Sequence, residues 1–122
     1  MKMGKDHEVP LSEAALRILR QMMPTDDTGA VATPATPIFW GQKPDKSLSQ
    51  MSMLMTLRRM GRGDLTTHGF RATFRIWAAE QTNFPREVVE HALAHQLRDK
   101  VEQAYQRSTL FERRRELMAA WA

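Results

Sequence analysis

The stretch LTTHGFRATFRIWAAEQ, residues 65–81, decides the fold of this chain. The glycines in the sequence GRGD just before it interrupt the preceding helix, and Thr66 or Thr67 can cap a new one. Apolar residues then recur at spacings of four and three, the period of one helix face. We therefore expect a helix over about residues 68–81. Its inward-facing side chains would be Phe70, Phe74 and Trp77.

Two further helices are expected on the N-terminal side of this stretch. Ser12 can cap a helix from about Glu13 to Met23, which carries apolar residues on one face. Ser47 and Gln50 have the spacing of a capping box and would open a helix through about residue 60. The segment between these helices is rich in Thr and Pro and is expected to be a loop.

On the C-terminal side, Pro85 suits the first turn of a helix that ends near His95. A short helix should cover residues 101–105, and a last one should run from about Leu110 to the end. At the other end of the chain, residues 4–6 suit the tip of a β-hairpin whose first strand is cut short. The expected fold is mainly α, with a truncated N-terminal β-hairpin.

Composition limits the class of protein without naming a function. The 122 residues suffice for one small domain, and 18 Lys and Arg against 14 Asp and Glu give a formal charge of +4. A surplus of this size permits nucleic-acid binding without requiring it. The chain has no cysteine, so that disulfides and cysteine metal sites are excluded. Neither a membrane span nor a signal-peptide core is visible, and a cytoplasmic protein is the default expectation.

Several polar residues could carry chemistry. His68 and Arg71 lie three apart at an expected helix start, where both project from one face and backbone amides favour an anion. This pair suits a phosphate, which Arg71 can hold through two N–H groups. His95 ends an apolar helix face, Tyr105 is the only tyrosine, and Lys2 lies near the N-terminus. Taken singly, each also has an ordinary structural explanation, such as a capping histidine or a half-buried tyrosine.

The order of these residues resembles the tyrosine recombinase or phage integrase family. A lysine lies ahead of Val9-Pro10-Leu11, a His-x-x-Arg opens a helix, a Leu-x-His ends another, and a tyrosine follows ten residues later. The surrounding sequence is also similar to integrases of prophages and genomic islands. The stretches that carry this similarity are residues 67–71, 90–95, 104–107 and the arginine-rich tail 113–121.

The resemblance implies strand transfer on DNA through a covalent phosphotyrosine. Tyr105 would attack the phosphodiester, while Arg71 and His95 would stabilise the phosphate. His68 would be the general base and Lys2 the general acid. No metal and no other cofactor would be needed, because the bond energy is kept in the protein–DNA ester.

The resemblance also implies that residues 1–122 are the C-terminal portion of a catalytic domain. The family's DNA-binding domains and the first of its two arginines would lie upstream, so we expect little activity from this chain alone. Its partners would be double-stranded DNA attachment sites and, in the full-length protein, further copies in a tetramer on DNA, with no role for a membrane. The last helix would pack either on a neighbouring protomer or on its own core through Leu117, Met118 and Trp121.

Four arginines are candidate contacts to the DNA backbone, although a solvated charged face explains each of them as well: Arg58, Arg59, Arg62 and Arg75. Two other functions remain open on the sequence. A type IB topoisomerase uses similar Arg, Lys, His and Tyr chemistry. A helical DNA-binding or protein-interaction module without catalysis would leave the order of the candidate residues as coincidence.

Overall fold

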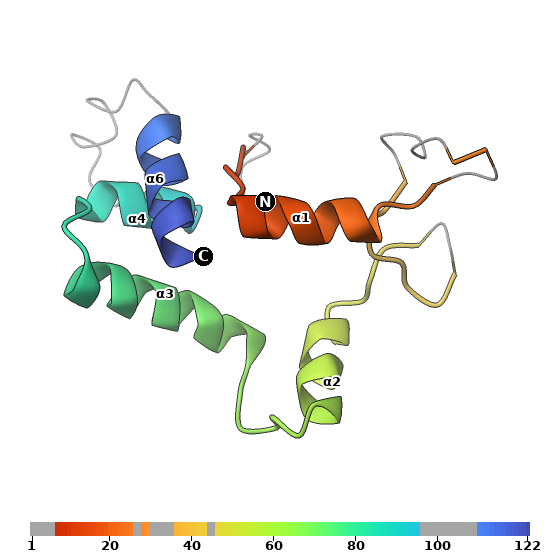
Figure 1. Ribbon diagram of the computed structural model, residues 1–122. Coiled ribbons are helices and arrows are strands. Elements are labelled where there is room, and N and C mark those ends of the chain that lie inside the picture. Colours follow the sequence, from red (N-terminus) through yellow and green to blue (C-terminus); the bar gives the residue numbers. More distant parts are fainter. Residues whose placement is uncertain (1–6, 26–27, 30–35, 44–45, 96–109) are drawn as a thin grey trace. The chain divides into compact units, whose positions relative to one another are not determined.

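The computed structural model describes residues 7–25, 28–29, 36–43, 46–95 and 110–122. These ranges form five helices and no strand, apart from an isolated antiparallel bridge between Trp40 and Ser47. The mainly α fold is confirmed, whereas the expected N-terminal hairpin and the expected short helix at 101–105 lie outside the described residues. The helices, labelled in Figure 1, are α1 (Glu13–Met22), α2 (Ser52–Arg59), α3 (Thr67–Gln81), α4 (Arg86–Ala92) and α6 (Phe111–Trp121).

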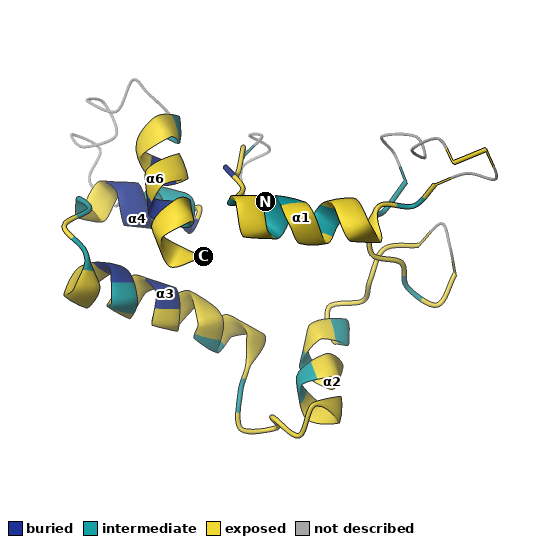
Figure 2. Ribbon diagram, in the orientation of Figure 1, coloured by how far each residue is buried: buried dark blue, intermediate teal, exposed yellow. Residues whose placement is uncertain are grey.

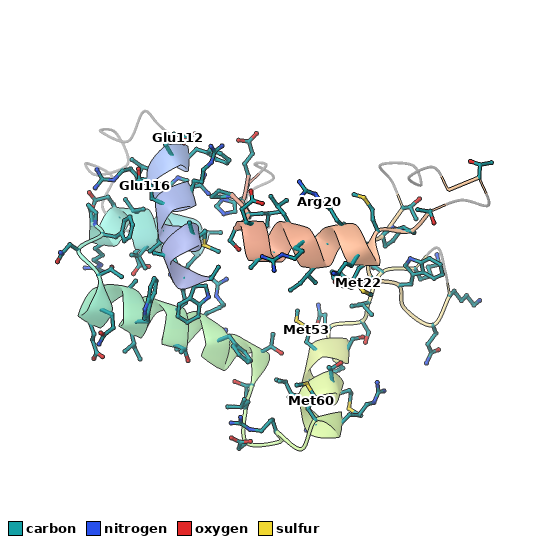
Figure 3. All side chains as sticks on the ribbon, in the orientation of Figure 1. Arg20, Met22, Met53, Met60, Glu112 and Glu116 are labelled. Atoms are coloured by element: carbon teal, nitrogen blue, oxygen red, sulfur yellow. The ribbon has the colours of Figure 1, made fainter. Side chains whose placement is uncertain are left out.

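The chain divides into two compact units. One unit combines residues 1–13 with residues 70–122 and therefore holds most of α3 together with α4 and α6. The other unit covers residues 14–69 and holds nearly all of α1 together with α2. None of the described residues of this second unit is fully buried, and methionines such as Met22, Met53 and Met60 project from it (Figure 3).

The core lies in the unit that contains α3, α4 and α6, as the dark blue segments of Figure 2 show. The ring of Trp121, at the end of α6, meets Phe74 edge-on at 5.4 Å and lies 4.8 Å from Trp77, both on α3. Edge and tilted arrangements of this kind are the favourable ones for aromatic rings. Helix α6 thus packs on the core of its own chain. The buried apolar residues are Phe74, Ala78, Val88, Val89, Leu93 and Leu117.

Two expectations about the helices are wrong in detail. Phe70 is 51% exposed, because the core on α3 begins one turn later at Phe74. The capping box at Ser47 and Gln50 does not form, since α2 begins only at Ser52 and its N-cap residue makes no side-chain hydrogen bond. Ser47 instead pairs with Trp40, which takes its backbone out of reach of a helix start.

None of the helices formed by the described residues has the length and apolar composition that crossing a membrane requires.

Candidate active site

Helix α3 begins at a threonine cap. The Thr66 hydroxyl accepts a hydrogen bond of 3.0 Å from the Gly69 amide, which satisfies one of the amide donors that every helix start leaves open. The predicted cap is confirmed, at Thr66. His68 and Arg71 follow in the first two turns of α3, where both are exposed and three residues apart, so they share one side of the helix.

Helix α4 ends in a Schellman motif, and this motif places His95. The His95 amide donates to the Glu90 carbonyl at 2.9 Å, and the Ala94 amide donates to the His91 carbonyl at 3.1 Å. Ala94 adopts the left-handed conformation, with a φ of 53°, at the position that such motifs usually fill with glycine. The chain therefore turns back at Ala94, and His95 contacts the last turns of α4.

The side chain of Glu90 binds His95 in this turn. Its Oε2 lies 2.6 Å from Nδ1 of His95, and the Glu90 side chain is only 8% exposed whereas that of His95 is 40% exposed. The other carboxylate oxygen, Oε1, lies 2.8 Å from Nη2 of Arg75 on α3. This second contact is an ion pair without hydrogen-bond geometry, since Oε1 has no hydrogen-bond partner among the described residues. Glu90 thus joins the turn that carries His95 to helix α3.

Arg71 makes a second link between the same two elements. Its Nη2 donates a hydrogen bond to the Leu93 carbonyl, two residues before His95. Carbonyls at a helix C-terminus carry partial negative charge and favour a cation, so this is a suitable anchor for a guanidinium. The structure therefore brings two of the predicted site residues, Arg71 and His95, to one place at the end of α4.

The remaining predicted catalytic residues are placed less fully. His68 is exposed at the start of the helix that carries Arg71. Tyr105 and Lys2 lie outside the described residues. Within the described ranges, no group of three or more His, Asp or Glu side chains could hold a metal ion.

Comparison with known proteins gives these residues a context. Residues 1–110 match the family described as the phage integrase family. The chain belongs to this family. The match includes every predicted catalytic residue, from Lys2 to Tyr105.

Relatives within the phage integrase family align over the whole of this chain. The prophage integrase IntA of Escherichia coli (strain K12) is 37% identical over 123 residues, which cover 100% of this chain and 28% of IntA. The prophage integrase IntZ of the same organism is 29% identical over 123 residues, with 100% and 29% covered. The integrase of Enterobacteria phage P4 is 29% identical over 126 residues, with 100% and 28% covered. The chain therefore spans less than a third of the length of these relatives, and no solved structure matches it significantly.

The four arginines proposed to contact DNA differ in their surroundings. Arg58 and Arg59 are exposed in the last turn of α2. Arg62 forms a two-bond ion pair with Asp64, at 3.0 and 2.9 Å, and its hydrogen bond and charge lower the pKa of the Asp64 carboxyl. Arg75 forms the ion pair with Glu90. Two of the four thus have a carboxylate partner already.

Sequence reasoning missed two residues that shape this part of the integrase chain. Glu90 escaped notice as one acidic residue among several, although it lies five residues before His95 and four after Arg86. Arg114 was included only in an arginine-rich tail, yet it is 1% exposed. Its position three residues before Leu117, on the buried side of α6, was the signal that could have singled it out.

Proposed function

We propose that this chain is the C-terminal part of the catalytic domain of a tyrosine-type, site-specific DNA recombinase that integrates or exchanges DNA. Membership of the phage integrase family supports the reaction class. The observation that carries the proposal is the hydrogen bond from Arg71 to the Leu93 carbonyl, because two of the residues proposed to bind the phosphate, Arg71 and His95, then lie near the same helix end. The similarity to two prophage integrases also supports this function.

In the proposed reaction, the Tyr105 oxygen attacks the phosphorus and forms the P–O bond of a 3′-phosphotyrosine. The bond from phosphorus to the 5′-oxygen breaks at the same time. His68 accepts the tyrosine proton, and Lys2 gives a proton to the departing 5′-oxygen. Reversal with a different 5′-hydroxyl joins new partners, and the balance requires no metal, nucleotide or other cofactor.

Arg71 and His95 stabilise the charge on the phosphate during this step. Nη2 of Arg71 holds the Leu93 carbonyl, and a guanidinium has five N–H donors in all, so that others can bind a non-bridging oxygen. Hydrogen-bond donors that are already in position need not move when negative charge develops in the transition state, so no free energy is spent on rearranging them. Anchoring at the end of α4 provides that fixation for both residues.

Little activity is proposed for the 122 residues alone. The family uses a second arginine, and no arginine of this chain outside the His68-to-Arg71 motif has a matching context. Removing one fixed phosphate donor typically lowers the rate by about 10²- to 10³-fold. In the full-length gene product, four copies would assemble on double-stranded DNA attachment sites, with Arg58, Arg59, Arg62 and Arg75 on the DNA backbone.

A nicked suicide substrate tests the proposal with the full-length gene product. The protein should form a covalent adduct with DNA that survives denaturation, and Tyr105→Phe should abolish it. Arg71→Lys, which keeps the charge and loses the fork of donors, should slow adduct formation by about 10²-fold. An adduct that persists in Tyr105→Phe would overturn the assignment. Tight DNA binding with no adduct in either protein would favour the binding module without catalysis.

A further inference from the structure

We infer that Glu90 is a positioning residue that holds the His95 imidazole by Nδ1 and so determines which of its nitrogens is available to a phosphate. The inference deepens the proposed function and rests on it for the role of His95. Glu90 itself is not proposed to touch DNA.

Glu90 is a buried carboxylate. A carboxylate taken out of water is costly unless charges and hydrogen bonds surround it. Among the residues that the structure describes, three basic side chains lie within 4 Å of the Glu90 carboxylate: His95 at 2.6 Å, Arg75 at 2.8 Å and Arg86 at 3.9 Å. Only the contact with His95 is a hydrogen bond. The His95 imidazole is therefore the basic neighbour that Glu90 holds in a fixed orientation.

A single hydrogen atom joins the Glu90 carboxylate and the His95 imidazole in this hydrogen bond. An ionised carboxylate can only accept hydrogen bonds, so Nδ1 of His95 must carry the hydrogen that lies between it and Oε2. If the imidazole is neutral, Nε2 then carries no hydrogen and can only accept a hydrogen bond. Nε2 becomes a donor only in the imidazolium, in which both nitrogens carry hydrogen.

The contact at Nδ1 limits how His95 can bind a phosphate. A hydrogen bond from His95 to a non-bridging phosphate oxygen must come from Nε2 of the imidazolium, because Nδ1 is occupied. A carboxylate on Nδ1 stabilises an imidazolium and fixes the ring orientation, as it does in hydrolase triads. We therefore assign the phosphate contact of His95 to Nε2, while Glu90 holds the ring through Nδ1.

Other charged groups around the pair lie on both neighbouring helices. Arg75 comes from α3, and Arg86 comes from α4. The Arg71 guanidinium holds the backbone two residues before His95. All of these groups are basic, and the Glu90 carboxylate offsets their positive charge in this part of the described structure. Removal of the carboxylate would leave that positive charge without a neighbouring negative group.

Nuclear magnetic resonance of the ring nitrogens of His95 tests the inference on the chain itself. Long-range proton–nitrogen correlation at mildly alkaline pH should show hydrogen on Nδ1 and none on Nε2. Glu90→Gln should lose this preference, since an amide can donate to Nδ1 as well as accept from it. Glu87→Gln, the same change on the exposed side of α4, should leave the His95 pattern as it is. Hydrogen on Nε2 of neutral His95 in the unaltered chain would overturn the inference, and this result needs no variant to fold.

Adduct formation by the full-length gene product gives the second readout. Glu90→Gln should lower the maximal rate of adduct formation by about 10-fold or more, as loss of a supporting carboxylate commonly does, and should change the DNA concentration for half-maximal rate little. An equal loss through weaker DNA binding would contradict a positioning role. If no adduct forms in any variant, the proposed recombinase function fails, while the nitrogen pattern still decides the link between Glu90 and His95.

Discussion

Nη1 of Arg114 donates a hydrogen bond of 2.6 Å to the carbonyl oxygen of Glu8, 106 residues earlier in the chain. Arg114 lies in the first half of α6 and is buried, and burial lowers the pKa of its guanidinium while the charge of Glu8 opposes the shift. Glu8 directly precedes Val9-Pro10-Leu11, the segment that follows the proposed general acid in sequence. Arg114 thus fastens the N-terminal segment to the C-terminal helix.

Arg114→Met should destabilise the chain by about 1–3 kcal/mol, because the Glu8 carbonyl loses its donor while the aliphatic volume is kept. Urea unfolding followed by circular dichroism measures the change. Arg113→Met, at an exposed position of the same helix, is the control and should alter the free energy of unfolding by less than about 0.5 kcal/mol. Equal effects of the two substitutions would show that the buried contact contributes nothing specific.

Ala94→Gly should stabilise the chain. Ala94 has a φ of 53°, a conformation that strains residues with a Cβ atom and costs glycine nothing. After the greater flexibility of glycine in the unfolded state is subtracted, we expect a gain of about 0.5–1 kcal/mol in the free energy of unfolding. Ala119→Gly, exposed within α6, should instead lose roughly 1 kcal/mol. Destabilisation by both substitutions would refute the assigned role of the left-handed turn.

Stability should fall as the pH drops below about 6.5, the ordinary pKa of histidine. Burial lowers the pKa of His91, and the positive charges of Arg114 and His7, whose ring lies 6.0 Å away, lower it further. The unfolded chain then binds more protons than the folded chain between the lowered value and about 6.5. The contribution of neutral His91 to the free energy of unfolding is therefore fully present above about pH 6.5 and is lost as the pH falls towards the lowered pKa.

Urea unfolding at about pH 7.5 and about pH 5.5 measures this effect. In His91→Gln, the difference in stability between the two pH values should shrink. His68→Gln, at an exposed position, should keep it. A pH dependence that is the same in His91→Gln as in the unaltered chain would assign the effect to other groups.

Asp64→Asn should tighten binding to duplex DNA, if Arg62 lies at the DNA backbone as proposed. The carboxylate now offsets Arg62 through two hydrogen bonds, and its removal adds one unit of positive charge. Arg62→Gln should do the reverse, and the slope of log affinity against log salt should become shallower by roughly one. Fluorescence anisotropy over a range of salt concentrations measures both. Weaker binding in Asp64→Asn would mean that the ion pair orients Arg62 for DNA.

Much of the helical fold could be predicted from the sequence because its signals are local. The cap at Thr66, the apolar period that follows it and the start of the last helix near Leu110 each depend on a few neighbouring residues. Where a local signal competed with other contacts, the prediction was wrong. Ser47 and Gln50 have the spacing of a capping box, but Ser47 pairs with Trp40 and α2 begins only at Ser52.

The candidate site was predictable as a list of residues and not as an arrangement. The order from His68 to Tyr105 is a property of the sequence, and the family match covers it. That Arg71 would hold the Leu93 carbonyl, or that Glu90 would lie under His95, depends on how α3 and α4 meet. The positions of Tyr105 and Lys2 in the site stay predictions.

By itself, the sequence determined most of the helices and the order of the residues proposed to act on a phosphate, because helix period, caps and motif spacing are written within short segments. The tertiary structure alone decided that Glu90 and Arg114 are buried and that Arg71 is anchored beside His95. Burial of a charge becomes favourable only when partners from distant segments surround it, and such partners are brought together by the packing of apolar helix faces.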